Sequence, residues 1–277
     1  MIKILLIGQN SFVAQNFIAT CESYGLILDT CSHNNIPDNL YVYGWIINFS
    51  INPKMFSEHY STSIDQDFLI SQKIVGNTQA RFVMISSRMV YPCYNSTVPL
   101  VESSVLEITN QNQYGLNKIQ SEREVRSILS ADKLLILRAS NIFGLESGRH
   151  TFMGMAQRRL IEKNEILLDM DEATIRDFIP VNYFCKCLLR LVNCNASGIY
   201  NVGSGEEITV HEICSEIIGG FGKGQLKMLP DSILKGQFIL DVSKLEKLTG
   251  YKINKAQILS YTRTLGEQLN MEKNKDE

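Results

Sequence analysis

The chain has 277 residues, of which 27 are Lys or Arg and 29 are Asp or Glu, and its formal net charge is −2. This length suits one large α/β domain, or a nucleotide-binding domain with a smaller second domain. The nearly balanced charge argues against a nucleic-acid partner, and no apolar run is long enough to span a membrane.

The seven cysteines are odd in number and include no Cys-x-x-Cys pair. This pattern favours free thiols in a reducing compartment over a disulfide framework or a zinc site. The apolar run at the N-terminus is too short for a secretion signal. We therefore expect a cytoplasmic protein without a metal.

The first predicted strand, Ile2–Ile7, is a nearly unbroken run of β-branched and leucine residues, typical of a strand buried on both faces of a parallel sheet. It leads through a Gly-Gln-Asn-Ser-Phe-Val-Ala turn at residues 8–14 into a predicted helix, Gln15–Ser23. Strand, tight turn and helix in this order can hold a dinucleotide, because small residues let backbone N–H groups approach a pyrophosphate. By itself the turn also fits an ordinary strand-to-helix connection.

Further apolar runs predict strands at Leu26–Cys31, Trp45–Ser50, Arg81–Ile85, Lys133–Arg138 and Gly198–Val202. Predicted helices separate most of these runs, and this alternation indicates a doubly wound parallel α/β sheet. Ligands of such sheets bind outside the carboxyl ends of the strands.

A serine pair closes the strand that begins at Arg81, and a Tyr-x-x-x-Lys pair follows it in a predicted helix. Tyr114 and Lys118 are four residues apart, so they share one helical face. An ammonium group beside a phenol lowers the pKa of the phenol, which suits general acid–base catalysis. A serine at the strand end can hold the substrate oxygen. Taken alone, such a pair also occurs on ordinary amphipathic helices.

These features together resemble the extended short-chain dehydrogenase/reductase family, in the branch of NAD-dependent nucleotide-sugar epimerases, dehydratases and reductases. The resemblance covers nearly the whole chain. It rests on Ser87 in a Ser-x-x-Val-Tyr segment, on Tyr114 and Lys118, and on an Arg-Asp-Phe-Ile-Pro-Val segment at residues 176–181.

The family's Gly-x-x-Gly-x-x-Gly pattern stands here as Gly8-x-x-Ser11-x-x-Ala14, so one glycine is retained. Ser11 and Ala14 are the next smallest residues and still meet the demand for space. The chain also looks too short between its second and third strands for the helix and strand that the family usually fits there. We therefore expect a more open adenine side.

The resemblance implies a Rossmann-type fold with a small C-terminal α/β substrate domain. The dinucleotide-binding domain would comprise residues 1–144 and about 177–205, and the substrate domain about 145–176 and 206–277. It also implies a homodimer, in which a predicted helix at Tyr60–Val75 and the helix of Tyr114 pack against the partner.

By the same resemblance, the expected catalytic residues are Ser87, Tyr114 and Lys118. The residues expected to bind the cofactor are Gly8, Asn10, Ser11, Phe12, Val13, Ser32, His33, Phe49, Ser50, Tyr114 and Lys118. The residues expected to bind the substrate, a nucleotide-diphosphate sugar, are Ser87, Met89, Asn141, Arg149 and Arg176.

Alignment with the family places Ser32 and His33 at the end of the second strand, where an acidic residue normally binds the adenine ribose and selects NAD. Neither side chain repels a 2′-phosphate, so the sequence favours NADP(H) over NAD(H). Asp29 would be the ribose ligand if the strand ended sooner.

We expect an NAD(P)H-dependent reductase of a nucleotide-linked keto sugar, a 4-keto-6-deoxy hexose, with Tyr114 as the general acid. Arg88 and Met89 stand where 4,6-dehydratases of the family resemble Asp-Glu, which argues against dehydration. One alternative is an NAD-dependent 4-epimerase. Another, allowed by the reduced glycine pattern, is a dinucleotide-binding sensor or scaffold without turnover.

Overall fold

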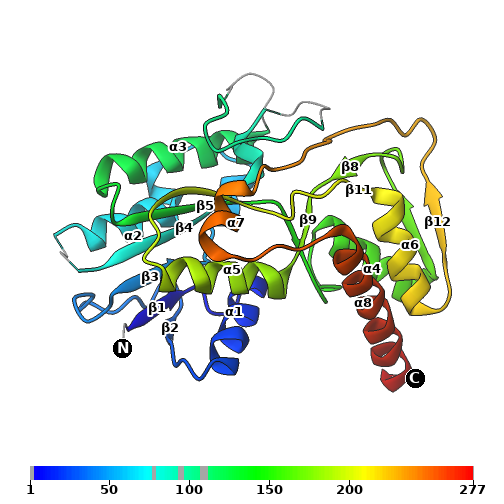
Figure 1. The fold of residues 1–277 in the computed structure, drawn as a ribbon, viewed down its shortest axis with the longest axis horizontal. Helices are drawn as coiled ribbons and strands as arrows, with labels where there is room; N and C mark the ends of the chain where they lie inside the picture. Colours follow the sequence, from blue (N-terminus) through cyan, green and yellow to red (C-terminus); the bar gives the residue numbers. More distant parts are fainter. Residues whose placement is uncertain (1–2, 77–78, 93–96, 107–111, 277) are drawn as a thin grey trace.

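The computed structural model describes residues 3–76, 79–92, 97–106 and 112–276 of the chain. A six-stranded parallel sheet forms its centre, in the order β10-β5-β4-β3-β1-β2 (Figure 1). The strands are β1 (Ile4–Ile7), β2 (Asp29–Cys31), β3 (Trp45–Asn48), β4 (Arg81–Ser87), β5 (Leu134–Ala139) and β10 (Gly198–Val202). The predicted doubly wound parallel sheet is therefore confirmed.

Helices cover both faces of this sheet (Figure 1). Helices α1 and α5 pack together on one face, and α2 and α3 pack together on the other. Their bounds are α1 (Phe12–Ser23), α2 (Gln66–Ile74), α3 (Gln113–Ile128) and α5 (Val181–Asn193). Alternating side chains of β1 enter different cores, since Leu6 joins one hydrophobic cluster and Leu5 joins the other. A strand that faces two cores must be apolar throughout, which explains the unbroken run in the sequence.

A smaller group of elements lies to one side of the sheet (Figure 1). It consists of α4 (Phe152–Lys163), β7 (Glu165–Leu168), β8 (Ile175–Arg176), β11 (Ile208–Thr209), α6 (Val210–Phe221), β12 (Gln225–Met228) and α8 (Lys255–Asp276). All of these elements except β8 contribute to one hydrophobic cluster, to which the six-stranded sheet contributes no residue among those described. The division into two domains and its boundaries stay a prediction.

Short elements connect the two groups. Strand β6 (Asn141–Phe143) pairs with β9 (Phe178–Pro180), and α7 (Ser243–Thr249) packs against α5 and β10. Three single turns of 3₁₀ helix are η1 (Pro53–Phe56), η2 (Thr62–Ile64) and η3 (Arg88–Val90).

The predicted helix at Tyr60–Val75 was wrong at its start, since α2 begins at Gln66. Asp65 has extended backbone angles, and its carboxylate accepts a hydrogen bond from the N–H of Asp67 at 3.0 Å. A side chain that caps the first turn in this way ends the preceding segment and starts the helix. Residues 32–44, between β2 and β3, form neither helix nor strand, as their small number predicted.

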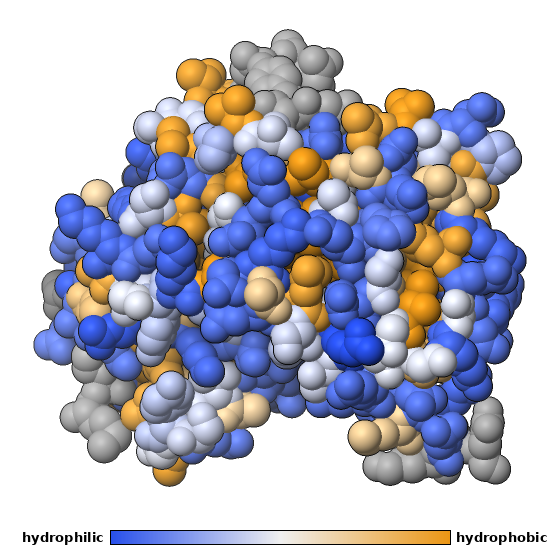
Figure 2. Space-filling model, turned by 45° about the vertical axis from the view of Figure 1, so that its right-hand side comes forward, coloured by the Kyte–Doolittle hydropathy of each residue, from blue (hydrophilic) through white to orange (hydrophobic). Residues whose placement is uncertain are grey.

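Hydrophilic side chains cover most of the face seen in Figure 2, and hydrophobic side chains gather there in separate groups. No helix within the described ranges is long and apolar enough to cross a membrane.

Gly8 lies where the ends of three strands meet. Its N–H donates to the carbonyl of Cys31 at 2.9 Å, and the N–H of Phe49 donates to the carbonyl of Ile7 at 2.8 Å. Gly8 has φ +86°, and a Cβ there would lie 2.6 Å from the backbone nitrogen of Ser50. Glycine is therefore required at position 8 for two reasons, its positive φ angle and its lack of a side chain.

We expect Gly8→Ala to lower the free energy of unfolding by about 2–5 kcal/mol, because it adds left-handed backbone strain and a backbone clash. Gly25→Ala is the matched control, since Gly25 has φ +70° but nothing within 4 Å of an added Cβ. It should cost about 1–2 kcal/mol. Urea unfolding measures both variants, and equal losses would show that the contact with Ser50 is not restrictive.

Candidate active site

A cavity of about 300 Å³ opens at the carboxyl ends of β4 and β5. Five of the predicted site residues line it together, namely Val13, Ser87, Tyr114, Asn141 and Arg149. They come from α1, β4, α3, β6 and the segment before α4. The structure thus gathers residues that are spread over about half of the chain.

Ser87 and Tyr114 meet across this cavity. Ser87 is the last residue of β4, and its Oγ accepts a hydrogen bond from the N–H of Met89 at 3.1 Å. Tyr114 lies in the first turn of α3, which Asn112 caps by accepting from the N–H of Gly115 at 2.8 Å. The Ser87 side chain also makes a hydrogen-bonding interaction with Tyr114 that lowers the pKa of the phenol.

Lys118 lies one turn further along α3 and is buried. Its Nζ donates to Asp67 at 2.8 Å and to the carbonyl of Ile85 at 3.0 Å. Burial acts to lower the pKa of Lys118, but Asp67 and Tyr114 raise it, and the net direction is upward. Lys118 therefore stays an ammonium ion. Its two acceptors among the described residues leave one of its three N–H groups for a ligand.

The protonation of Tyr114 depends on opposing effects. Burial raises the pKa of Tyr114 most, Lys118 lowers it, and Asp67 raises it again, so that the net direction is upward. The predicted lowering by Lys118 is present but is outweighed by burial. Without a ligand the phenol keeps its proton at neutral pH, which is the form that a general acid needs.

Asp67 is the site residue that sequence reasoning missed. Its side chain and that of Lys118 are each only 4% exposed, and Asn48 at the end of β3 donates to its second carboxylate oxygen at 2.7 Å. The sequence offered only a weak signal for a site role of Asp67. An aspartate in the first turn of a helix is usually explained by its favourable interaction with the helix dipole. Only packing of α2 against α3 shows that Asp67 faces Lys118.

Apart from Tyr114 and Lys118 on α3, the residues predicted for the cofactor follow the carboxyl ends of β1, β2 and β3. Ser11 caps α1 by accepting from the N–H of Ala14 at 3.2 Å, and no acidic side chain stands in the first turn of that helix. Phe49 and Ser50 follow β3 and pack closely over Gly8. A tight glycine turn that leads into a helix N-terminus fits a dinucleotide pyrophosphate, although the family's second and third glycines are absent.

The two residues that follow β2 carry no carboxylate. Ser32 follows that strand and is half-buried, and His33 is exposed. Asp29 lies at the start of β2, opposite Leu5, where it pairs with Lys3 at 2.7 Å and accepts from the Tyr43 hydroxyl at 2.7 Å. Asp29 therefore already has two partners. It also lies two residues before the end of the strand.

The residues predicted for the substrate separate into two groups. Asn141 and Arg149 line the cavity, whereas Met89 and Arg176 do not. Arg176 on β8 is mostly buried, which lowers its pKa, and its Nε has no hydrogen-bond partner in the described part of the chain. Its Nη2 donates to the carbonyl of Lys235 at 3.3 Å. A buried guanidinium group with an unused donor suits an anionic ligand.

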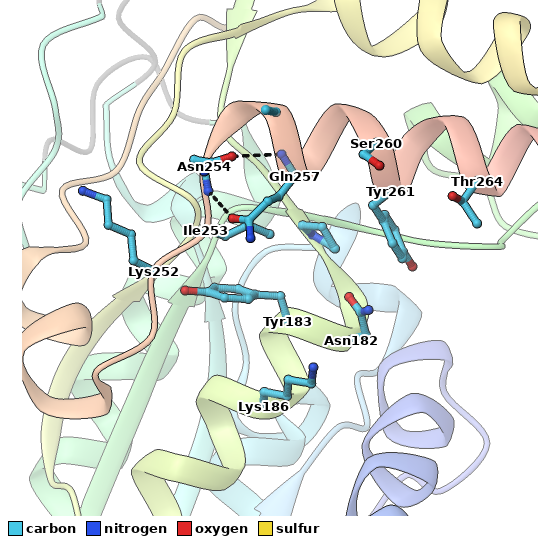
Figure 3. A pocket seen from close by; sticks show the side chains of 12 residues that line it. Asn182, Tyr183, Lys186, Lys252, Ile253, Asn254, Gln257, Ser260, Tyr261 and Thr264 are labelled. Carbon is cyan, nitrogen blue, oxygen red and sulfur yellow. Dashed lines mark hydrogen bonds between the residues drawn. The ribbon is translucent and has the colours of Figure 1, made fainter.

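A second, larger groove of about 590 Å³ lies between the start of α5 and the first turns of α8 (Figure 3). Ser87, Tyr114 and Lys118 are absent from its lining. Asn254 and Gln257, which face this groove, bond to each other's backbone N–H groups at 2.9 and 3.0 Å and so cap α8 (Figure 3). The predicted chemistry therefore belongs to the smaller cavity.

Comparison with known proteins identifies relatives of this fold. The model of the NAD dependent epimerase/dehydratase family matches residues 62–203, slightly more than half of the chain. A curated relative, ADP-L-glycero-D-manno-heptose-6-epimerase of Alkalilimnicola ehrlichii, is 28% identical over 143 residues. That match covers 46% of this chain and spans 44% of the relative.

Solved structures match over nearly the full length. UDP-N-acetylglucosamine 4-epimerase of Methanobrevibacter ruminantium superposes with a TM-score of 0.81 at 16% identity, covering 98% of this chain and 100% of that one. dTDP-glucose 4,6-dehydratase of Bacillus anthracis, in complex with NAD, gives 0.79 at 16% identity over 99% and 98%. RMD of Pseudomonas aeruginosa, complexed with NADPH, gives 0.77 at 18% identity over 98% and 99%. At these identities the likeness shows the fold alone.

Removing the carboxylate of Asp67 should strongly destabilise the fold. In Asp67→Ala, Lys118 keeps a buried charge without its partner, so we expect the free energy of unfolding to fall by about 3–5 kcal/mol. The double variant Asp67→Ala/Lys118→Met should recover much of this loss, because no unpaired buried charge is left.

Glu58→Ala is the control for this measurement, since the Lys54–Glu58 ion pair is 57% and 52% exposed. Its loss should cost less than about 1 kcal/mol. Similar denaturant midpoints for Asp67→Ala and Glu58→Ala would contradict a desolvated Lys118–Asp67 pair.

Proposed function

Since the chain belongs to the NAD dependent epimerase/dehydratase family, we propose that it is an NAD(P)H-dependent reductase of a nucleotide-linked keto sugar, a 4-keto-6-deoxy hexose. The observation that carries this proposal is the meeting of Ser87 and Tyr114 across one cavity, beside the buried ammonium of Lys118. A binder without turnover has no use for a phenol held in this way.

Each of the three residues has a distinct role in this reaction. A bound nicotinamide dinucleotide supplies the hydride. The Ser87 hydroxyl holds the carbonyl oxygen of the sugar, and the Tyr114 hydroxyl donates its proton to that oxygen as negative charge develops. Lys118 offers its remaining N–H to the nicotinamide ribose and stabilises the phenolate that proton donation leaves behind.

Two observations favour an exchangeable NADP(H) over a tightly held NAD. Ser32 and His33, which follow β2, carry no carboxylate, and Asp29 is engaged by Lys3 and Tyr43. Residues 32–44 also leave the adenine side without the helix and strand expected of the family. NAD(H) is the alternative cofactor.

The nucleotide diphosphate of the substrate is proposed to bind towards Arg176, whose buried guanidinium group has an unused donor. Asn141 would contact the sugar from the cavity wall, with Met89 near the entrance. The substrate would thus lie between the proposed dinucleotide-binding domain (1–144 and about 177–205) and the proposed substrate domain (about 145–176 and 206–277).

Dehydration is disfavoured by the residues that follow Ser87. Arg88 occupies the first of the two positions that resemble Asp-Glu in the family's 4,6-dehydratases, and its guanidinium carbon lies 4.0 Å from the ring centre of Phe238. Arg88 and Met89 offer no carboxylate pair to eliminate water.

An NAD-dependent 4-epimerase is the second candidate, because several similar proteins are sugar epimerases. The same three residues would then act twice on one bound sugar. Purified protein that carries NAD would favour the epimerase, and protein that must be supplied with NADPH would favour the reductase. A cytoplasmic homodimer through α2 and α3 is part of this proposal, and size-exclusion chromatography would test the dimer.

Tyr114→Phe should lower kcat by about 10²–10⁴-fold, because the general acid is lost. The dinucleotide dissociation constant should stay nearly unchanged. The assay follows the absorbance of NADPH, and then of NADH, with a panel of nucleotide-linked keto sugars. Tyr24→Phe, an exposed tyrosine outside the cavity, is the control. Full activity of Tyr114→Phe would overturn the assignment.

The pH profile of reduction should report the raised pKa of Tyr114. A general acid is active when protonated, so the rate should hold through neutral pH and fall only as the pH rises through the pKa of Tyr114. Asp67 raises that pKa, so Asp67→Asn should move the alkaline fall to lower pH. An unshifted profile would show that Asp67 does not act on the acid.

A further inference from the structure

We infer that Arg149 binds the pyrophosphate of the nicotinamide dinucleotide, and not the diphosphate of the substrate. This inference rests on the proposed function, because it requires a dinucleotide at the N-terminus of α1. It assigns the cofactor a ligand that comes from the segment before α4, outside the glycine turn.

Arg149 lies against the first turn of α1. Its guanidinium carbon lies 4.6 Å from the ring centre of Phe12, the first residue of α1. The side chain is 39% exposed, and it lines the same cavity as Val13, Ser87 and Tyr114. A cation is therefore held against the first turn of the helix whose N-terminus faces the predicted pyrophosphate site.

The glycine turn and the N-terminus of α1 offer little positive charge to a pyrophosphate. A pyrophosphate carries two negative charges, and a helix N-terminus supplies only about half a positive charge. The Ser11 hydroxyl already serves as the cap of α1, and the first turn contains no lysine or arginine. A guanidinium fork beside Phe12 adds a full charge and paired N–H donors, which match phosphate oxygens.

The buried carboxylate of Glu146 anchors the guanidinium group of Arg149. The Nη1 of Arg149 donates to Glu146 at 2.6 Å, and the same carboxylate oxygen accepts from the Thr151 hydroxyl at 2.8 Å. Glu146 is buried, with its side chain 1% exposed. Among the described residues, this carboxylate is the one hydrogen-bond partner of the Arg149 side chain, so the other guanidinium N–H groups are available to a ligand.

The backbone at Arg149 is also held in place. Its carbonyl accepts from Arg158 at 3.4 Å, and α4 passes so close that Gly154 leaves no room for a Cβ beside that carbonyl. A side chain fixed at both its backbone and its head is preorganised for one ligand position. The cation is therefore built into the site before any ligand arrives.

The test measures dinucleotide binding directly. Calorimetric titration of the full chain with NADPH, NADH and ADP-ribose should show dissociation constants about 10- to 100-fold higher in Arg149→Gln, the loss expected for a charge-assisted hydrogen bond. Adenosine, which lacks the pyrophosphate, should bind both proteins equally. Arg149→Lys keeps the positive charge but loses the paired guanidinium donors. Its dissociation constants should lie between those of the unaltered chain and those of Arg149→Gln.

Arg159→Gln is the matched control, because Arg159 lies on α4, pairs with Glu165 and does not line the cavity. It should bind dinucleotide like the unaltered chain. If thermal unfolding shows that Arg149→Gln is destabilised by the unpaired Glu146, the double variant Glu146→Gln/Arg149→Gln removes that charge and should show the same weakened binding.

Unchanged dinucleotide affinity in Arg149→Gln would overturn the inference, above all if the KM for the nucleotide sugar rose instead. That result would leave the proposed reductase standing. An unaltered chain that binds neither NADPH nor NADH would overturn the proposed function, and this inference with it.

Discussion

A buried ammonium group holds the candidate active site together. Lys118 donates to Asp67 on α2 and to the carbonyl of Ile85 on β4. The side-chain amide of Asn48 on β3 donates to the second carboxylate oxygen of Asp67. Four elements thus meet at one charge pair. The hydrogen bonds from Asn48 to Asp67 and from Lys118 to Ile85 help to offset the desolvation of the two charges. The pair therefore fixes the first turns of α3 and, with them, Tyr114.

The same pair sets the charge state of Tyr114. Burial and Asp67 raise the pKa of the phenol, whereas Lys118 and Ser87 lower it. Phe56 adds to the burial, since its ring stacks on that of Tyr114 with 4.7 Å between the ring centres. The result is a neutral phenol beside a permanent cation, which can give up a proton to a developing alkoxide. This arrangement suits reduction of a carbonyl group.

Two other buried carboxylates hold the walls around the cavity. Glu122 on α3 accepts two hydrogen bonds from Arg138 at the end of β5, at 3.1 and 2.7 Å. Asp177 accepts from the backbone N–H groups of Ser204, Gly205 and Leu240. Glu122 thus holds the Arg138 side chain and Asp177 holds backbone, whereas Ser87, Tyr114 and Arg149 line the cavity.

The sequence by itself determined the sheet and the meeting of Ser87 with Tyr114. Strands buried on both faces must be apolar throughout, and the ends of parallel strands share one edge. Tertiary structure alone decided that Asp67, 51 residues from Lys118 in the chain, is its partner, and that Arg149 lies on Phe12. An aspartate in a first helical turn and an arginine in a loop each fit an exposed surface equally well. Their partners depend on how distant elements pack, because burial by that packing is what makes a charge require a partner.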